Sequence, residues 1–236
     1  MKEISFILLI LFSFCVQASG SKALPYQIDV DLTDQKSLQR GFTAFVENCL
    51  GCHSTQYQRY NRIGQDLGIS LQKMKSQFIH TGTKVGEHVM SAMLPKESAQ
   101  WFGVAPPDLT LVARVRGASW IYSYLKSFYV DPSRPFGVNN TVFPTVAMPH
   151  VLEKLQGTPI AQRDAQGHIT NIEASGGQYT PEEYDQFVKD ITSFLTYSAE
   201  PVQVERKRIG VWVLVFLAVF SILGWFLKRE YWKDVH

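Results

Sequence analysis

Residues 49–53 of this 236-residue chain read CLGCH, so two thiols and an imidazole share about one turn of chain. Covalent haem sites, halves of structural zinc sites and redox dithiols all use this spacing. The chain has three cysteines, and the third, Cys15, lies in an N-terminal segment with the features of a cleaved signal. The mature chain therefore keeps only the two cysteines of this motif.

Zinc and dithiol chemistry fit the motif poorly. A structural zinc site needs a complete set of closed ligands, and no other cysteine remains to supply a second pair. A C-x-x-C dithiol is typical of a strand-to-helix turn, whereas apolar residues at helical spacing over 38–46 precede this motif. The motif therefore predicts one covalent haem c, with thioethers at Cys49 and Cys52 and with His53 as one axial ligand of the iron.

The second axial ligand decides whether such an iron transfers electrons or binds small molecules. Met148 stands between Pro144 and Pro149, which prevent a continuous helix and fix an irregular loop. A thioether on a stiff loop suits a closed, high-potential iron, so this residue is favoured. The full set of candidates is Met74, Met90, Met93, Met148, His80, His88, His150 and His168.

Four of the other candidates need separate comment. Met74 has helical spacing with its apolar neighbours, which predicts a core position. Met90 and Met93 are the main rivals for the iron, and His150 is a further alternative.

The two ends of the chain predict its location. Residues 1–20 begin with Lys2, continue with an apolar run too short to span a bilayer and end in small residues, as in a signal peptide. The uncharged run 209–227 would span about 28 Å as a helix, enough for a transmembrane anchor. We therefore expect a single-pass membrane protein. Its expected parts are an exported haem domain at 21–204, an anchor at 205–228 and a cytoplasmic tail at 229–236.

Two helices should frame the haem. In class I c-type cytochromes an N-terminal helix with a glycine and an aromatic residue crosses a C-terminal helix, and Gly41 and Phe45 before Cys49 resemble that pattern. Residues 180–197 carry a helix start with a capping box, Thr180 to Glu183, and then one apolar stripe. The predicted fold is mainly α, a class I c-type cytochrome domain with long loop insertions plus one C-terminal transmembrane helix.

Further elements are expected between these helices. The pattern predicts helices at 70–82 and 119–129 and a hairpin at 160–172 around Gly167.

Charge adds little about partners. The formal net charge is +2 and the basic residues cluster beside the membrane span, so we expect no nucleic-acid partner. Glu182, Glu183, Asp185 and Asp190 predict a solvated acidic face, which could also steer a basic electron acceptor.

Three runs of sequence resemble cytochrome c1, the haem subunit of the bacterial ubiquinol-cytochrome c oxidoreductase complex. They are WFGVAPPDLTLVARVRG at 101–117, WIYSYLKSFYVDPSRPFGVNN at 120–140 and VFPTVAMPHVL at 142–152. The resemblance implies that Arg116 faces a haem propionate and that Pro106 and Pro107 wall the haem. It also implies the thioether sites and axial ligands Cys49, Cys52, His53 and Met148. The family's Gly-Gly-acid-Tyr stretch reads GASW here, so no role for that tyrosine is transferred.

The same resemblance implies a location in the bacterial inner membrane, with the haem domain in the periplasm, and it implies a function. The chain would take single electrons from a Rieske iron-sulfur protein and pass them to a cytochrome c, in a complex with cytochrome b. It would be an electron-transfer subunit of a quinol-cytochrome c reductase rather than a self-sufficient enzyme. A monohaem subunit of a terminal oxidase or another dehydrogenase is the alternative. A membrane-anchored haem sensor is another, and it would need a vacant or easily displaced sixth ligand.

The motif itself gives a first prediction. We expect one haem per chain that survives acid-acetone extraction, because thioether bonds are covalent, and loss of stable haem when Cys49 and Cys52 are both changed to Ala. Haem stoichiometry and extraction of the purified protein measure this. Extractable haem, or two haems per chain, would contradict the motif assignment.

Overall fold

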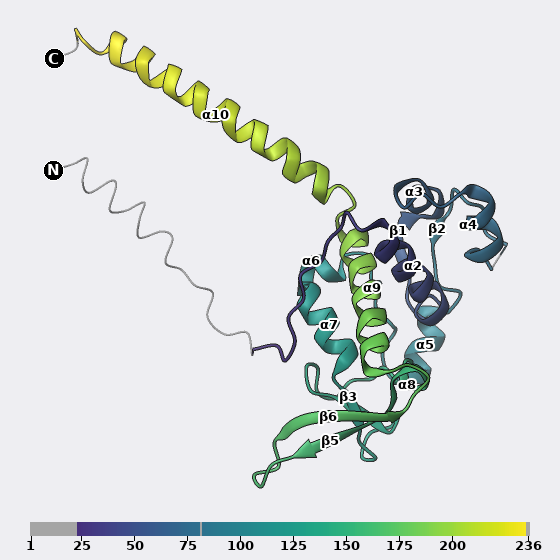
Figure 1. Ribbon diagram of the computed structural model, residues 1–236. Coiled ribbons are helices and arrows are strands. Elements are labelled where there is room, and N and C mark those ends of the chain that lie inside the picture. Colours follow the sequence, from purple (N-terminus) through teal and green to yellow (C-terminus); the bar gives the residue numbers. More distant parts are fainter. Residues whose placement is uncertain (1–22, 81, 235–236) are drawn as a thin grey trace.

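The computed structural model describes residues 23–80 and 82–234, so the predicted signal peptide at 1–20 lies outside the described residues. The described chain is mainly helical, with long connecting loops (Figure 1). Its helices are α2 (Gln35–Asn48), α3 (Tyr60–Asp66), α4 (Leu71–Gln77), α5 (Pro95–Phe102), α6 (Val112–Arg116), α7 (Ala118–Lys126), α8 (Glu153–Gln156), α9 (Pro181–Ala199) and α10 (Gln203–Tyr231).

The strands form small antiparallel pairs, β1 with β2, β3 with β4 and β5 with β6. Their bounds are β1 (Thr55–Arg59), β2 (His88–Val89), β3 (Phe128–Val130), β4 (Val138–Asn140), β5 (Gly157–Arg163) and β6 (Ile169–Gly176). The β5–β6 hairpin extends from the end of the domain that faces away from α10 (Figure 1).

Helices α2 and α9 cross at the centre of the domain, which confirms the predicted helix pair. A Cβ atom added at Gly41 would lie 2.0 Å from the backbone oxygen of Asp190, so only glycine permits this approach. The rings of Phe42 and Phe45 lie 5.2 and 5.4 Å, centroid to centroid, from the ring of Phe194. Glycine brings the backbones together, and the three aromatic rings fill the space beside them.

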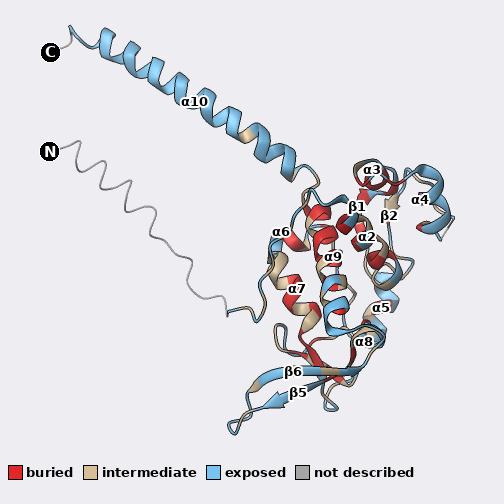
Figure 2. Ribbon diagram, in the orientation of Figure 1, coloured by how far each residue is buried: buried red, intermediate tan, exposed pale blue. Residues whose placement is uncertain are grey.

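Local sequence explains where these two helices begin. The side chain of Asp34 accepts hydrogen bonds from the backbone N–H groups of Lys36 and Ser37 at the start of α2. The predicted capping box of Thr180 and Glu183 is present at the start of α9. The buried residues concentrate on α2, α7 and α9 (Figure 2), so two of the three helices that carry the core begin at a side-chain cap.

The acidic face of α9 is only partly solvated. Glu182 and Glu183 are exposed, but Asp190 is 4% exposed, so the predicted position of that carboxylate in solvent is wrong. It lies at the helix crossing, where Ser37 Oγ donates to it at 2.7 Å and Arg40 Nε at 2.6 Å. The close approach covers the carboxylate, and these two groups compensate its charge.

Two predicted helices are shorter than expected. Helix α7 ends at Lys126, and residues 128–130 form β3, which pairs with β4. The predicted helix to Tyr129 is wrong at its end because the aromatic and β-branched residues there form a strand pair closed by a turn from Asp131 to Gly137. Helix α4 occupies only the first part of the predicted 70–82 segment, whereas the hairpin predicted at 160–172 is confirmed and is longer.

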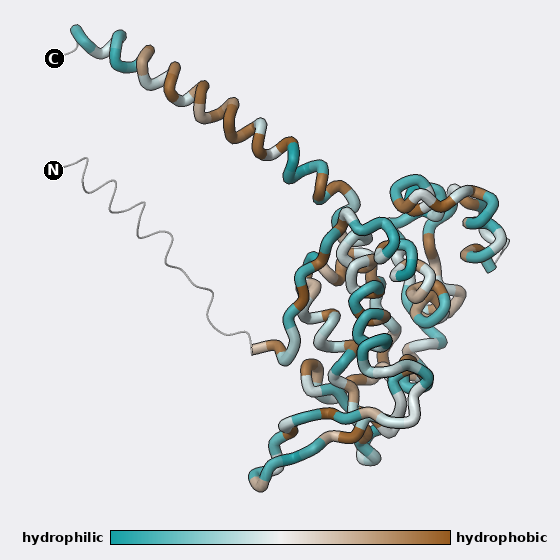
Figure 3. The backbone as a smooth tube through the Cα atoms, viewed as in Figure 1, coloured by the Kyte–Doolittle hydropathy of each residue, from teal (hydrophilic) through white to brown (hydrophobic). Residues whose placement is uncertain are grey.

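Helix α10 contains the predicted apolar span and extends past it at both ends. None of its most apolar 18-residue stretch is buried inside the structure. Figure 3 shows this segment as a continuous apolar stretch leaving the domain. Among the described residues it is the one helix long and apolar enough to cross a membrane.

The helix crossing gives a stability prediction. Gly41→Ala should lower the free energy of unfolding by about 1–3 kcal/mol, because the new methyl group would force α2 away from α9. Denaturant unfolding of the haem-loaded protein in detergent measures this. Gly86 is the matched control, since nothing lies within 4 Å of a Cβ added there. Equal stability of the two alanine variants would contradict the close-approach argument.

Candidate functional site

The predicted site residues line one cavity of about 710 Å³. This volume lies within the ~300–1,000 Å³ typical of pockets that hold a small molecule or cofactor. The end of α2, helices α6, α7 and α9, and loops within 101–109 and 143–151 form its walls. The five predicted site residues on these walls are Cys49, Cys52, His53, Arg116 and Met148.

The C-x-x-C-H loop continues directly from α2. Cys49 caps the helix with its N–H bonded to the Phe45 oxygen at 2.8 Å, and the N–H of His53 then donates to the Cys49 oxygen at 2.8 Å. This tight turn places both thiols at the cavity, and neither forms a disulfide. Burial, and then the neighbouring Cys52, raise the pKa of the Cys49 thiol to about 12. A reactive dithiol needs a thiolate, so this environment argues against that alternative.

The ring of His53 is oriented by a backbone carbonyl. Its Nδ1 lies 2.7 Å from the oxygen of Pro107. A carbonyl can only accept, so Nδ1 carries the proton and Nε2 keeps a free lone pair, the arrangement found in metal-binding histidines. Burial lowers the pKa of His53, which keeps the ring neutral. The imidazole is therefore prepared to bind a metal through Nε2.

Asp108 holds this carbonyl in place. Its carboxylate accepts hydrogen bonds from the N–H groups of Gln56 at 2.8 Å and Thr110 at 2.9 Å. The Leu109 N–H also donates to the Ser54 oxygen at 2.8 Å. The bonds from Gln56 and to Ser54 join the segment after His53 to residues 108–109, which directly follow the two prolines of the cavity wall. Asp108 was not predicted from the sequence, although an acidic residue directly after Pro106 and Pro107 was a visible signal.

Met148 lies on another wall of the cavity. Its loop packs on a small separate core of Phe128, Val138 and Val146. Thr145 in this loop has a φ of 63°, a left-handed conformation that costs a β-branched residue about 1–3 kcal/mol. The surrounding contacts therefore hold the loop in one conformation despite this strain, as expected of a rigid loop that presents a ligand.

The rival ligands lie elsewhere. Met74 is fully buried in the main core, as predicted. His150 is 8% exposed, stacks on Phe128 and is bonded through Nε2 to Gln156 Oε1 at 2.7 Å. Met90 and Met93 are not among the cavity-lining residues. Of the methionines and histidines in the described chain, only His53 and Met148 line the cavity.

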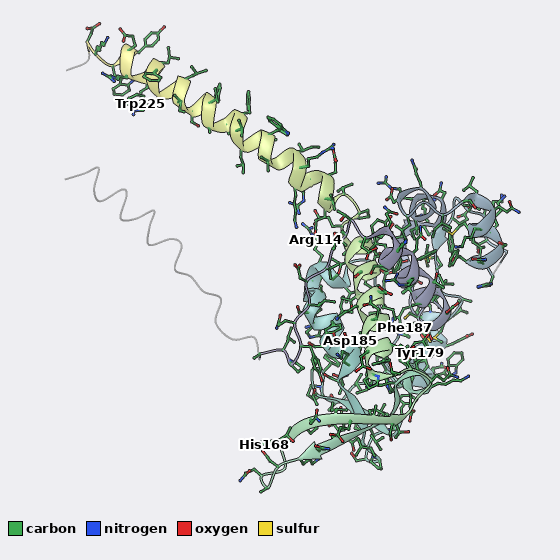
Figure 4. All side chains as sticks on the ribbon, in the orientation of Figure 1. Arg114, His168, Tyr179, Asp185, Phe187 and Trp225 are labelled. Carbon is green, nitrogen blue, oxygen red and sulfur yellow. The ribbon has the colours of Figure 1, made fainter. Side chains whose placement is uncertain are left out.

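Arg116 lies at the cavity on an aromatic support. Its guanidinium carbon is 5.1 Å from the ring centre of Trp120, and that ring stacks on Tyr124 at 5.1 Å. Arg114 is bonded instead to Glu200 at 2.7 Å, close to the base of α10 (Figure 4). Trp120 and Tyr124 were not predicted from the sequence, although their four-residue spacing was a signal that these two aromatic residues share one face of a helix, here α7. Arg116 ends α6, and Gly117 separates the two helices.

Two crossing helices that hold a C-x-x-C-H loop against an apolar cavity define a class I c-type cytochrome domain, here followed by one long apolar helix. The chain belongs to the cytochrome c1 family, since the model of the Cytochrome C1 family matches residues 26–235. This confirms the resemblance and the fold class predicted from the sequence. Members of this family carry one covalently bound haem c. The chain is therefore a haem electron-transfer subunit, and the cavity residues fit that cofactor.

Individual relatives agree with the family match. Cytochrome c1 of Allochromatium vinosum is 47% identical over 97% of this chain and 96% of the relative. A Nitrosomonas europaea protein named ammonia monooxygenase gamma subunit is 43% identical over the full length of both chains. Cytochrome c1 of Rhodospirillum rubrum is 28% identical over 86% of this chain and 83% of the relative.

The two neighbouring arginines give a prediction. Arg116→Ala should lower the haem potential, because a cation at the cavity opposes the extra positive charge of ferric iron. Arg116→Lys should keep part of that effect but lose the planar bidentate geometry. Redox titration measures both variants, with Arg114→Ala as the control outside the cavity. A larger shift for the control would contradict the role of Arg116.

Proposed function

We propose that this chain is a membrane-anchored monohaem cytochrome that carries single electrons from a Rieske iron-sulfur protein to a cytochrome c. It would do so in a quinol-oxidising respiratory complex that also contains cytochrome b. The observation that carries the proposal is the cavity that brings Cys49, Cys52, His53 and Met148 together from distant parts of the chain.

Each cavity residue has a distinct role in the proposal. The thiols of Cys49 and Cys52 would hold the haem, and Nε2 of His53 and Sδ of Met148 would bind its iron. Arg116 supplies a cation for a haem propionate. The haem supplies a one-electron ferrous–ferric couple. With His53 and Met148 both on the iron, the site would favour electron transfer over small-molecule binding, and for this reason we prefer the proposal to a sensor.

The proposed location rests on the signal-like sequence of residues 1–20 and on the apolar helix α10. In the proposed arrangement, residues 21–204 form a periplasmic haem domain, 205–228 anchor it in the bacterial inner membrane and 229–236 form a cytoplasmic tail. The apolar helix α10 supports the anchor. Trp212 and Trp225 near its ends suit the two membrane interfaces (Figure 4 labels Trp225).

The assembly partners give a direct test. Purification of the chain from membranes in mild detergent should yield cytochrome b and Rieske subunits with it. Protein identification by mass spectrometry measures this. Copurification with a haem–copper oxidase core, or with the subunits of an ammonia monooxygenase, would contradict the proposed complex and leave the haem assignment intact.

The axial ligand gives a second test. Met148→Ala should lower the haem potential and let the reduced protein bind carbon monoxide, because loss of the thioether opens the iron and removes a ligand that favours the ferrous state. Redox titration and absorption spectra measure this. Met90→Ala and Met93→Ala are the controls. An effect of either control with none for Met148→Ala would contradict the ligand assignment.

A further inference from the structure

The side chain of Tyr124 reaches the sulfur of Met148 from the neighbouring wall of the cavity. The tyrosine hydroxyl lies 3.4 Å from Met148 Sδ. A thioether can only accept, so the hydroxyl is the donor. Among the described residues, this sulfur is the one hydrogen-bond partner of that hydroxyl. A half-buried tyrosine usually directs its hydroxyl to a partner, and here the partner is the proposed ligand itself.

Packing fixes the tyrosine ring on both sides. Trp120, one helical turn earlier, stacks on it with the ring planes 11° apart. Phe128, the first residue of β3, meets it edge-on with ring centroids 5.2 Å apart. The ring therefore has little freedom to rotate. Ring packing by Trp120 and Phe128, and not a further hydrogen bond, directs the hydroxyl of Tyr124 at the sulfur.

A buried asparagine ties the same tyrosine to the ligand loop. Asn140 is 1% exposed, and its Nδ2 donates to the backbone oxygen of Tyr124 at 2.8 Å. Its Oδ1 accepts from the N–H groups of Val142 and Phe143, which begin the loop that carries Met148. Asn140 therefore links the backbone of Tyr124 to the backbone of the Met148 loop. This link fixes the distance between the hydroxyl and the sulfur in addition to the ring packing.

We propose that Tyr124 is a positioning residue that tunes the haem potential through Met148. A thioether sulfur has two lone pairs, and with one given to the iron the other can accept the tyrosine O–H. This hydrogen bond orients the sulfur and withdraws electron density from it, so the sulfur donates less to ferric iron. Tyr124 therefore raises the potential. The inference rests on the proposed role of Met148 as axial ligand.

Tyr124→Phe in the complete haem-loaded protein tests this, because phenylalanine keeps the ring between Trp120 and Phe128 and removes only the hydroxyl. We expect a lower potential. The shift should correspond to a change of about two- to tenfold in the ferrous-to-ferric ratio, which is the effect of one net hydrogen bond. A tenfold change corresponds to about 59 mV for one electron. The sulfur-to-iron absorption of the ferric protein should also shift.

Tyr122→Phe is the matched control. Tyr122 lies two positions earlier on α7, does not line the cavity and bonds through its hydroxyl to Asp185. Removal of the Tyr122 hydroxyl should leave the potential and the sulfur-to-iron absorption unchanged. Equal shifts in the two tyrosine variants would overturn the inference.

A double variant separates the inference from the ligand assignment. In a Met148→Ala background, Tyr124→Phe should cause no further shift, because the sulfur through which it acts is gone. A persistent shift would show that the hydroxyl acts on the haem by another route and would overturn the inference. If Met148→Ala alone left the potential unchanged, the ligand assignment would fail first and the inference with it.

Discussion

The contact of α2 with α9 at Gly41 is the constraint on which the rest of the domain depends. Glycine allows the two backbones to meet, and the aromatic rings beside it lock their angle. Because the C-x-x-C-H loop begins where α2 ends, the crossing fixes where both thiols lie. Helix α9 also contributes Ile191 and Leu195 to the cavity wall. A local shift at the crossing would therefore be transmitted directly to the cofactor site.

From this frame, two further walls bring the proposed axial ligands together by different means. His53 is oriented by backbone hydrogen bonding, since Asp108 holds the segment whose carbonyl accepts from Nδ1. Met148 is held by a small hydrophobic core and by a strained loop. The hydrogen bond to the carbonyl selects the tautomer of His53. The packed loop positions the sulfur of Met148, which has no strong directional preference of its own. Together they describe a site prepared for a metal with two protein ligands.

The sequence predicted the parts of this account that depend on local chemistry. The haem motif, the capping box at Thr180 and the hairpin around Gly167 are short patterns made by residues that are close together in the sequence. The burial of Asp190 could not be predicted, because it depends on how closely another helix approaches. The strand at 128–130 depends on a partner strand ten residues away, whose pairing outweighs helical propensity. The link between Tyr124 and Met148 likewise joins separate segments, and only the folded chain brings them into contact.

The central claim is that the iron is held between an imidazole and a thioether. X-ray absorption at the iron edge of the native, membrane-extracted protein tests it most directly, since sulfur and nitrogen neighbours scatter differently and lie at different distances. The account predicts a sulfur ligand together with imidazole and haem nitrogens in both oxidation states. A spectrum with nitrogen ligands alone, or with an open coordination position, would contradict it.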